Sequence, residues 1–131
     1  MKFVKKWITQ ANSDLNAAKD SLISQHYDWA CFQAQQSAEK ALKAYLYYKG
    51  YTSIITHSLK ELIRECGKIE KEFLELKDQA RFLDMFYIAT RYPNGLVGEL
   101  APSEFYEKED AKKCINCAEL ILKKVKKFLK I

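Results

Sequence analysis

Glycine and proline are scarce in this chain, whose 131 residues include only four glycines and two prolines. Because these residues interrupt helices and form tight turns, their scarcity argues against many short strands and favours long helices. Long apolar runs are also missing, and no segment approaches the ~20 apolar residues of a membrane-spanning helix. The first residues, Met1 to Trp7, contain no apolar stretch of signal-peptide length. We therefore expect a cytoplasmic protein with no membrane segment.

Cysteine occurs four times, and in a cytoplasmic protein we expect reduced thiols rather than disulfides. Cys114 and Cys117 form a CxxC pair, but they lie inside a strongly helical stretch, whereas a redox pair needs a helix N-terminus. A zinc site needs two further ligands. The remaining candidate ligands are scattered singly: Cys31, Cys66, His26 and His57. We interpret the cysteines as small buried apolar residues and expect neither a metal nor a cofactor.

The formal net charge is +5, and lysines gather near both ends of the chain. These lysines are Lys2, Lys5, Lys6, Lys123, Lys124, Lys126, Lys127 and Lys130. A basic patch attracts phosphates or nucleic acid. Lysines on the outer face of an amphipathic helix are more often only solvated, so both interpretations stay open.

Apolar residues recur at spacings of three and four in four segments, which indicates helices that each bury one face. The predicted helices cover about Phe3–Ser24, Tyr27–Lys49, Ile69–Thr90 and Glu107–Leu129. Ser58 and Glu61 form a capping-box sequence that predicts a shorter helix, with Gly67 as its C-terminal cap. Gly50 ends the second helix, and Tyr92 to Ser103 is the longest segment predicted to be non-helical.

These elements predict an all-α fold, an antiparallel up-down four-helix bundle with an additional short helix, in one domain over residues 1–131. The second helix carries more aromatic rings than one helix buries alone: Trp29, Tyr45, Tyr47 and Tyr48. We expect some of them to contact a second copy of the chain, and therefore predict a homodimer.

Two polar stretches are candidate binding sites. On the second helix, spacings of three and four place four polar residues on one flank: Gln36, Glu39, Lys40 and Lys43. Near the proline-glycine loop, Arg91 is suited to bind a phosphate or a carboxylate, and Tyr92 is suited to stack on a base. His57, before the short helix, is a candidate to join them.

Plainer interpretations of the same residues are structural. Glu39 and Lys43 have the spacing of an ordinary helix ion pair. Arg91 has a position from which it can bind the last carbonyls of its own helix. His57 can pack as a residue that stabilises the start of the short helix.

The sequence resembles the HEPN domain family over nearly its whole length. The resemblance rests on Trp7, Ala11, Asp14-Leu15, on residues 27–44 with the run Gln-Gln-Ser-Ala-Glu-Lys-Ala-Leu-Lys-Ala, on His57-Ser58-Leu59, and on residues 83–93 with the ending Thr-Arg-Tyr-Pro. It implies a bundle of four to five helices, usually homodimeric. It also implies nucleotide binding, often beside a minimal nucleotidyltransferase that is encoded as a separate partner.

Many HEPN proteins are metal-independent ribonucleases, some of them toxins, that use an arginine followed after four to six residues by a histidine. Arg91 matches that arginine, but the positions for the histidine hold Leu96, Val97 and Gly98. None of these transfers a proton, and RNA cleavage needs a base and an acid. The sequence therefore favours a non-catalytic HEPN module that binds a nucleotide, RNA or a nucleotidyltransferase partner, as the companion in a toxin–antitoxin type of two-gene module. A metal-independent ribonuclease that uses a displaced histidine, such as His57, is the alternative.

Overall fold

The computed structural model describes all residues from Met1 to Ile131 and contains helices but no strands. Its elements are α1 (Lys2–Ile23), α2 (Tyr27–Tyr48), α3 (Leu59–Ile69), the 3₁₀ helix η1 (Lys71–Leu76), α4 (Lys77–Asp84), the 3₁₀ helix η2 (Pro93–Gly95), α5 (Pro102–Phe105) and α6 (Lys108–Leu129). The predicted all-α class is confirmed.

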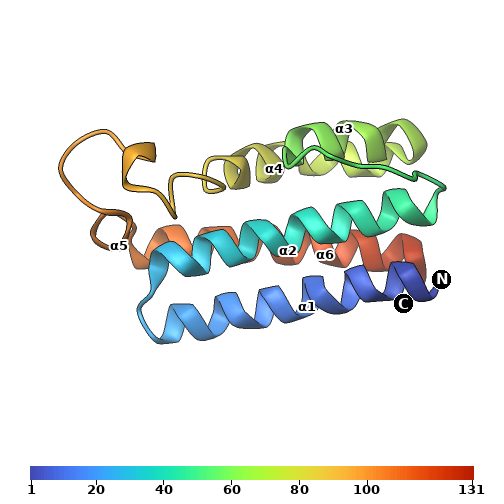
Figure 1. Cartoon of the computed structure of the whole chain (residues 1–131). Helices are drawn as coiled ribbons and strands as arrows, with labels where there is room; N and C mark the ends of the chain where they lie inside the picture. Colours follow the sequence, from blue (N-terminus) through green and yellow to red (C-terminus); the bar gives the residue numbers. More distant parts are fainter.

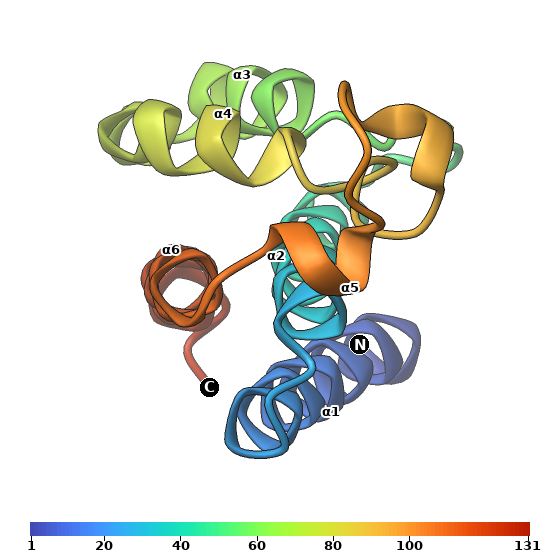
Figure 2. The same ribbon diagram turned by 90° about the vertical axis from the view of Figure 1, so that its left-hand side faces the viewer.

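Four of these elements form the predicted up-down bundle. Figure 1 shows that α1, α2, α4 and α6 alternate in direction along the chain, while α3 is the additional helix and runs parallel to α2. Seen from the end, α1, α2 and α6 lie beside one another, and α3 and α4 form a layer next to α2 and α6 (Figure 2). No helix is both long and apolar enough to cross a membrane.

The centre of the bundle is α2, which contacts α1, α3 and α6. Small side chains allow these close approaches, and each is fully buried: Ala30, Ala34, Ala38, Ala41 and Ala44. The hydroxyl of Ser37 donates a hydrogen bond of 2.7 Å to the carbonyl oxygen of Ala11, which joins α2 to α1. Because these three neighbours pack so closely, little of the surface of α2 remains open to solvent.

Two of the four aromatic rings named on α2 pack against other parts of the same chain. Tyr45 is buried, with its ring centroid 4.7 Å from that of Phe73. Tyr47 packs on Trp7 of α1 at 5.2 Å between centroids. Tyr45 and Tyr47 therefore pack within the chain, whereas Trp29 and Tyr48 are exposed, and contact of some of these rings with a second copy of the chain stays a prediction.

The helix predicted over residues 69–90 is interrupted. α3 continues through Gly67 to Ile69, so Gly67 is not the predicted cap, and Glu70 is extended (φ −136°, ψ 107°). A Cβ atom on Gly67 would lie 2.3 Å from Cδ2 of Leu74, so the glycine permits the close packing of α3 on η1. The chain then leaves the helix after Asp84, six residues earlier than predicted.

Asp84 ends α4 and caps the start of α3. Its carboxylate accepts hydrogen bonds from the backbone N–H groups of Leu59 (2.6 Å) and Lys60 (3.0 Å) and from the hydroxyl of Ser58 (3.3 Å). Half of the predicted capping box is also present, since the Ser58 hydroxyl accepts from the N–H of Glu61 at 3.3 Å, whereas the N–H of Ser58 donates to the hydroxyl oxygen of Thr56 at 3.1 Å and not to Glu61. Local sequence thus starts α3, and a residue 25 positions away completes its cap.

The predicted non-helical segment from Tyr92 to Ser103 is largely irregular, with η2 and the first residues of α5 as short helical turns. Its preceding turn is held by Thr90, whose hydroxyl donates to the carbonyl oxygen of Phe86 at 2.6 Å. A Cβ atom on Gly95 would lie 2.9 Å from Cα of Ala89, which shows how closely the loop folds back on this turn. This packing fixes the backbone that carries Arg91.

Candidate functional site

Arg91 lies in the turn after α4, and aromatic rings surround its guanidinium group. The guanidinium carbon is 4.3 Å from the ring centroid of Phe32, 4.9 Å from that of Tyr87 and 5.2 Å from that of Tyr92. Nε donates to the carbonyl oxygen of Tyr87 at 3.0 Å, which is the local bond that the structural interpretation predicted. None of the ion pairs in the structure involves Arg91. The cation is therefore oriented but not neutralised.

His57 reaches the same aromatic ring from the loop before α3. Its imidazole stacks on Tyr87 with 5.0 Å between centroids and an interplanar angle of 17°. Nδ1 lies 3.1 Å from Oε2 of Glu39, and because a carboxylate only accepts hydrogen bonds, Nδ1 is the donor. This leaves Nε2 facing away from the carboxylate, on a side chain that is 54% exposed.

Glu39 and Lys43 form the predicted helix pair, but the pair is buried. Nζ of Lys43 lies 3.1 Å from Oε2 of Glu39, and each side chain is only 6% exposed. Gln35 donates to the other carboxylate oxygen of Glu39 at 3.3 Å. The positive charge of Lys43 is thus balanced inside the protein and is not presented to a ligand.

The predicted polar flank of α2 separates into two parts. Gln36 donates to Oε1 of Gln35 at 2.7 Å and so belongs to the network around Glu39. Lys40 points to the other side, where it forms an ion pair with Asp14 of α1. Tyr92 lies beside Arg91 and is half exposed. The structure therefore brings Gln36, Glu39, Lys43 and His57 into one network, places Arg91 and Tyr92 next to it, and leaves Lys40 apart.

Tyr87 and Phe32 are the site residues that sequence reasoning missed. Tyr87 touches both His57 and Arg91, and Phe32 forms the nearest aromatic wall of Arg91. The apolar spacing of Tyr87 with Ala80 and Leu83 suggested only core packing, and Phe32 entered only within residues 27–44 of the family resemblance. The available signal was the aromatic character of residues next to the two polar stretches.

This arrangement combines two chemical capacities. Arg91 offers an unpaired cation between ring faces, which suits a phosphate attached to a stacked base. His57, oriented by Glu39, offers an exposed imidazole whose second nitrogen is not engaged by the carboxylate, and an imidazole placed in this way is a common proton-transfer group in catalysis. In the loop after Arg91, Val97 is fully exposed and supplies no titratable group.

The cysteines form no disulfide, and all four are buried. Burial raises the pKa of the Cys114 and Cys117 thiols, which opposes formation of a reactive thiolate. No three His, Cys, Asp or Glu side chains come close enough together to hold a metal ion. At the C-terminal end of the chain, Lys124 and Lys127 are not a free patch, because both pair with Glu72 of η1 at 2.8 Å.

Comparison with known proteins relates the chain and its fold to one family. A protein of Methanocaldococcus jannaschii named "Putative toxin MJ1304" is 36% identical over 138 residues, covering 99% of this chain and 90% of that protein. Sacsin from Homo sapiens is 23% identical over 95% of this chain, which corresponds to only 3% of the length of sacsin.

Solved structures show the same fold. TT1696 from Thermus thermophilus superposes with a TM-score of 0.85 and 32% identity, covering 97% of this chain and 98% of that one. ST0689, an archaeal HEPN homologue, superposes with a TM-score of 0.77 and 39% identity, covering 94% of each chain. A HEPN domain protein from Thermotoga maritima superposes with a TM-score of 0.76 and 30% identity, covering 95% of this chain and 98% of that one. The family model of the HEPN domain matches residues 4–128, and the chain therefore belongs to the HEPN domain family.

Proposed function

We propose that this HEPN protein is one component of a toxin–antitoxin type of module, and that Arg91 binds a phosphate of a nucleotide. The likeness to a protein named as a toxin supports the first part. The observation that carries the second part is the guanidinium of Arg91, which lies against three aromatic rings without a carboxylate partner. The cytoplasmic location stays a prediction from the sequence.

Several features of the site favour a nucleotide as its ligand. The bond from Nε to the Tyr87 carbonyl holds the guanidinium in place, so its terminal N–H groups are directed before a ligand arrives. The half-exposed ring of Tyr92 offers a face on which a base can stack. Lys40 and Lys43, which the sequence placed at the site, are engaged with Asp14 and Glu39 and are not included in the proposal.

Calorimetric titration with AMP tests this proposal, because AMP joins one base to one phosphate. We expect saturable binding by the unmodified protein and a loss of at least about tenfold in affinity for Arg91→Ala, the size expected when a charged hydrogen bond is removed. Lys5→Ala removes an equal charge from an exposed position of α1 and serves as the control. Absence of heat with AMP, or equal affinity of Arg91→Ala and the unmodified protein, contradicts the proposal.

A nucleotidyltransferase partner follows from the family resemblance, and the site suits it because such an enzyme handles nucleotides. Co-purification of this chain with a small nucleotidyltransferase encoded next to it tests the idea. We expect a stable complex that resists gel filtration. Separate elution of the two proteins at micromolar concentration contradicts it.

Metal-independent RNA cleavage is a second candidate, and one observation favours it. Glu39 is buried and orients the exposed imidazole of His57, as a general base requires, and the ring of Tyr87 connects that imidazole with the cation of Arg91. Incubation with RNA in the presence of EDTA tests this function. Cleavage that is lost in both His57→Ala and Arg91→Ala supports it, and intact RNA with the unmodified protein rejects it.

A further inference from the structure

A second cationic site lies on the far layer of the fold, between α3 and the η1–α4 segment. The structure has a cavity there of about 420 Å³. Five of its eight lining residues are basic, and none is acidic: Lys60, Arg64, Lys68, Lys77 and Arg81. No residue of this cavity belongs to the Arg91 site. We refer to it below as the α3–α4 cavity.

The basic residues form two rows because of their helical spacing. Lys60, Arg64 and Lys68 follow one another at intervals of four on α3, and Lys77 and Arg81 do so on α4. An interval of four advances the chain by about 6 Å, so each row places one cation roughly every helical turn. The two rows belong to neighbouring helices and line one cavity.

Most of this charge has no partner within the protein. Only Lys68 forms an ion pair, with Glu65 at 3.1 Å and on the exposed surface. The other four basic residues of the cavity appear in none of the ion pairs. By contrast, Lys124 and Lys127 on α6 are neutralised by glutamates of η1. Mutual repulsion of uncompensated cations is unfavourable, and an anion that binds there removes it.

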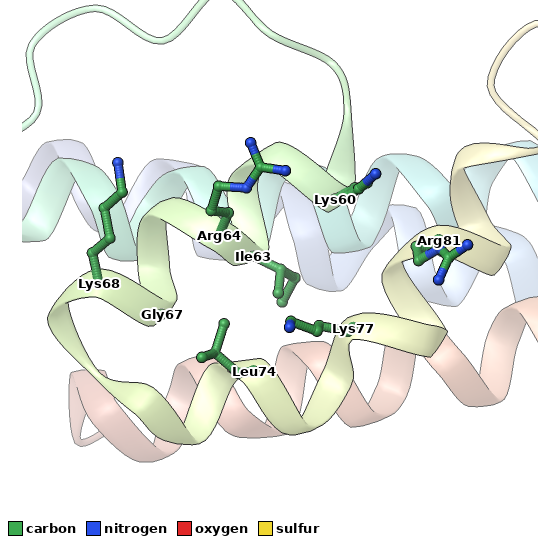
Figure 3. Close-up of a pocket in the computed structure, with 8 residues that line it drawn as sticks. All are labelled: Lys60, Ile63, Arg64, Gly67, Lys68, Leu74, Lys77 and Arg81. Atoms are coloured by element: carbon green, nitrogen blue, oxygen red, sulfur yellow. The ribbon is translucent and has the colours of Figure 1, made fainter.

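The remaining lining residues are Ile63, Gly67 and Leu74. Figure 3 shows Ile63 and Leu74 pointing towards each other across the space between the helices, and Lys77 reaching into that space from α4. No aromatic ring lines the cavity, so it lacks the stacking surface that recognises a base. A ligand is therefore recognised there by its negative charge.

We propose that the α3–α4 cavity binds an oligophosphate chain of three or more phosphates, carried by a nucleoside triphosphate or by inorganic polyphosphate. The compact charge of such a chain matches four unpaired cations around one cavity of small-ligand size. An RNA strand carries one charge per nucleotide and gains from aromatic platforms, which this cavity does not have. Orthophosphate carries less charge than an oligophosphate and is expected to bind more weakly to a site that is recognised by charge.

Calorimetric titration of the full chain with sodium tripolyphosphate tests this proposal. We compare Arg64→Gln combined with Arg81→Gln against Lys5→Gln combined with Lys123→Gln, which removes the same charge from exposed positions elsewhere. We expect tripolyphosphate affinity to fall about tenfold or more in the arginine pair and about twofold or less in the control. Parallel titrations in the Arg91→Ala background, which lacks the proposed nucleotide site, are expected to show ATP following tripolyphosphate and orthophosphate binding far more weakly.

Several outcomes overturn the proposal. An equal loss in the arginine pair and in the control means that only the net charge matters. Tripolyphosphate that does not bind, or a single-stranded RNA that binds more tightly than tripolyphosphate and loses affinity in the arginine pair, also rejects it. Under this proposal, Arg91→Ala keeps full affinity for tripolyphosphate. The same set of titrations therefore distinguishes a failure of the α3–α4 cavity proposal from a failure of the proposed AMP site.

Discussion

At the scale of single residues, Tyr87 links the two side chains that carry the proposed chemistry. His57 stacks on its ring, and Arg91 packs against it. We expect Tyr87→Leu to weaken AMP binding about fivefold, because a cation–aromatic contact contributes roughly 1 kcal/mol. Tyr87→Phe keeps the ring and is expected to bind as the unmodified protein does. Calorimetry on both variants checks this, and equal losses in the two contradict the role of the ring.

The buried pair of Glu39 and Lys43 gives a prediction about stability. Glu39→Gln leaves the ammonium group of Lys43 buried without a counter-charge, which costs about 3–5 kcal/mol. The double replacement Glu39→Met with Lys43→Met removes both charges and is expected to recover most of that loss. Urea unfolding of the three proteins measures the difference, and a double variant as unstable as Glu39→Gln contradicts this account.

Cys66 gives a prediction about pH. Burial, the largest cause, and the nearby charge of Glu65 both raise the pKa of its thiol above the ordinary value of 9.0. Because the folded pKa is raised, the stabilising contribution is complete below pH 9 and declines above it, as the unfolded chain loses a proton that the folded chain retains. Above pH 9, this one group is expected to lower the free energy of unfolding by about 1.4 kcal/mol per pH unit. Thermal melts between pH 8 and 10 should show a shallower decline in Cys66→Ala, and parallel curves contradict the assignment.

At the scale of the elements, Asp84 fastens the start of α3 to the end of α4. Asp84→Ala removes the acceptor for two backbone N–H groups and for the Ser58 hydroxyl. Loss of such a cap costs about 1–2 kcal/mol, visible as a lower melting temperature. Asp84→Asn retains an acceptor, and its melting temperature is expected to lie between those of Asp84→Ala and the unmodified protein. Hydrogen exchange should show faster exchange at Leu59 and Lys60 in Asp84→Ala, and unchanged exchange there argues against the cap.

The long helices were predictable because their information is local. The bounds expected for α1, α2 and α6 agree with the structure within one residue at every end, since each helix repeats its apolar residues without interruption. A break near Gly67 was predicted, but the 3₁₀ form of η1 was not, because the apolar spacing of Phe73, Leu76 and Ala80 continues through this segment. The close approach of Gly67 of α3 to Leu74 of η1 is a contact between elements, which the sequence does not display.

The candidate site was predictable as a set of residues but not as an arrangement. Glu39, His57 and Arg91 were named from residue type and spacing. That Glu39 holds His57, 18 positions away, and that Tyr87 links His57 to Arg91 depends on the loop that returns from α2 to α3. The ion pair of Lys40 with Asp14 was not foreseen either, because it depends on how α1 packs against α2.

At the scale of the whole molecule, exposed apolar side chains gather in the segment that carries Arg91. They are Met85, Ile88, Tyr92, Val97 and Leu100. We predict that this segment contributes to a homodimer. Light scattering coupled to gel filtration should give twice the 15.3 kDa mass of the single chain. Ile88→Glu is expected to shift the protein to the monomer, and a monomeric unmodified protein at millimolar concentration contradicts the dimer.

The measurement that tests the Arg91 site most directly is a nuclear magnetic resonance titration with AMP, observing the side-chain signals of Arg91, His57 and Tyr92. The proposed site predicts that the Nε–H signal of Arg91 and the ring signals of Tyr92 and His57 move together and saturate at one AMP concentration. Signals of Arg64 and Arg81 in the α3–α4 cavity are expected to stay in place. If AMP leaves the Arg91 signal unmoved, or moves only the signals of the cavity, the proposed nucleotide site is wrong.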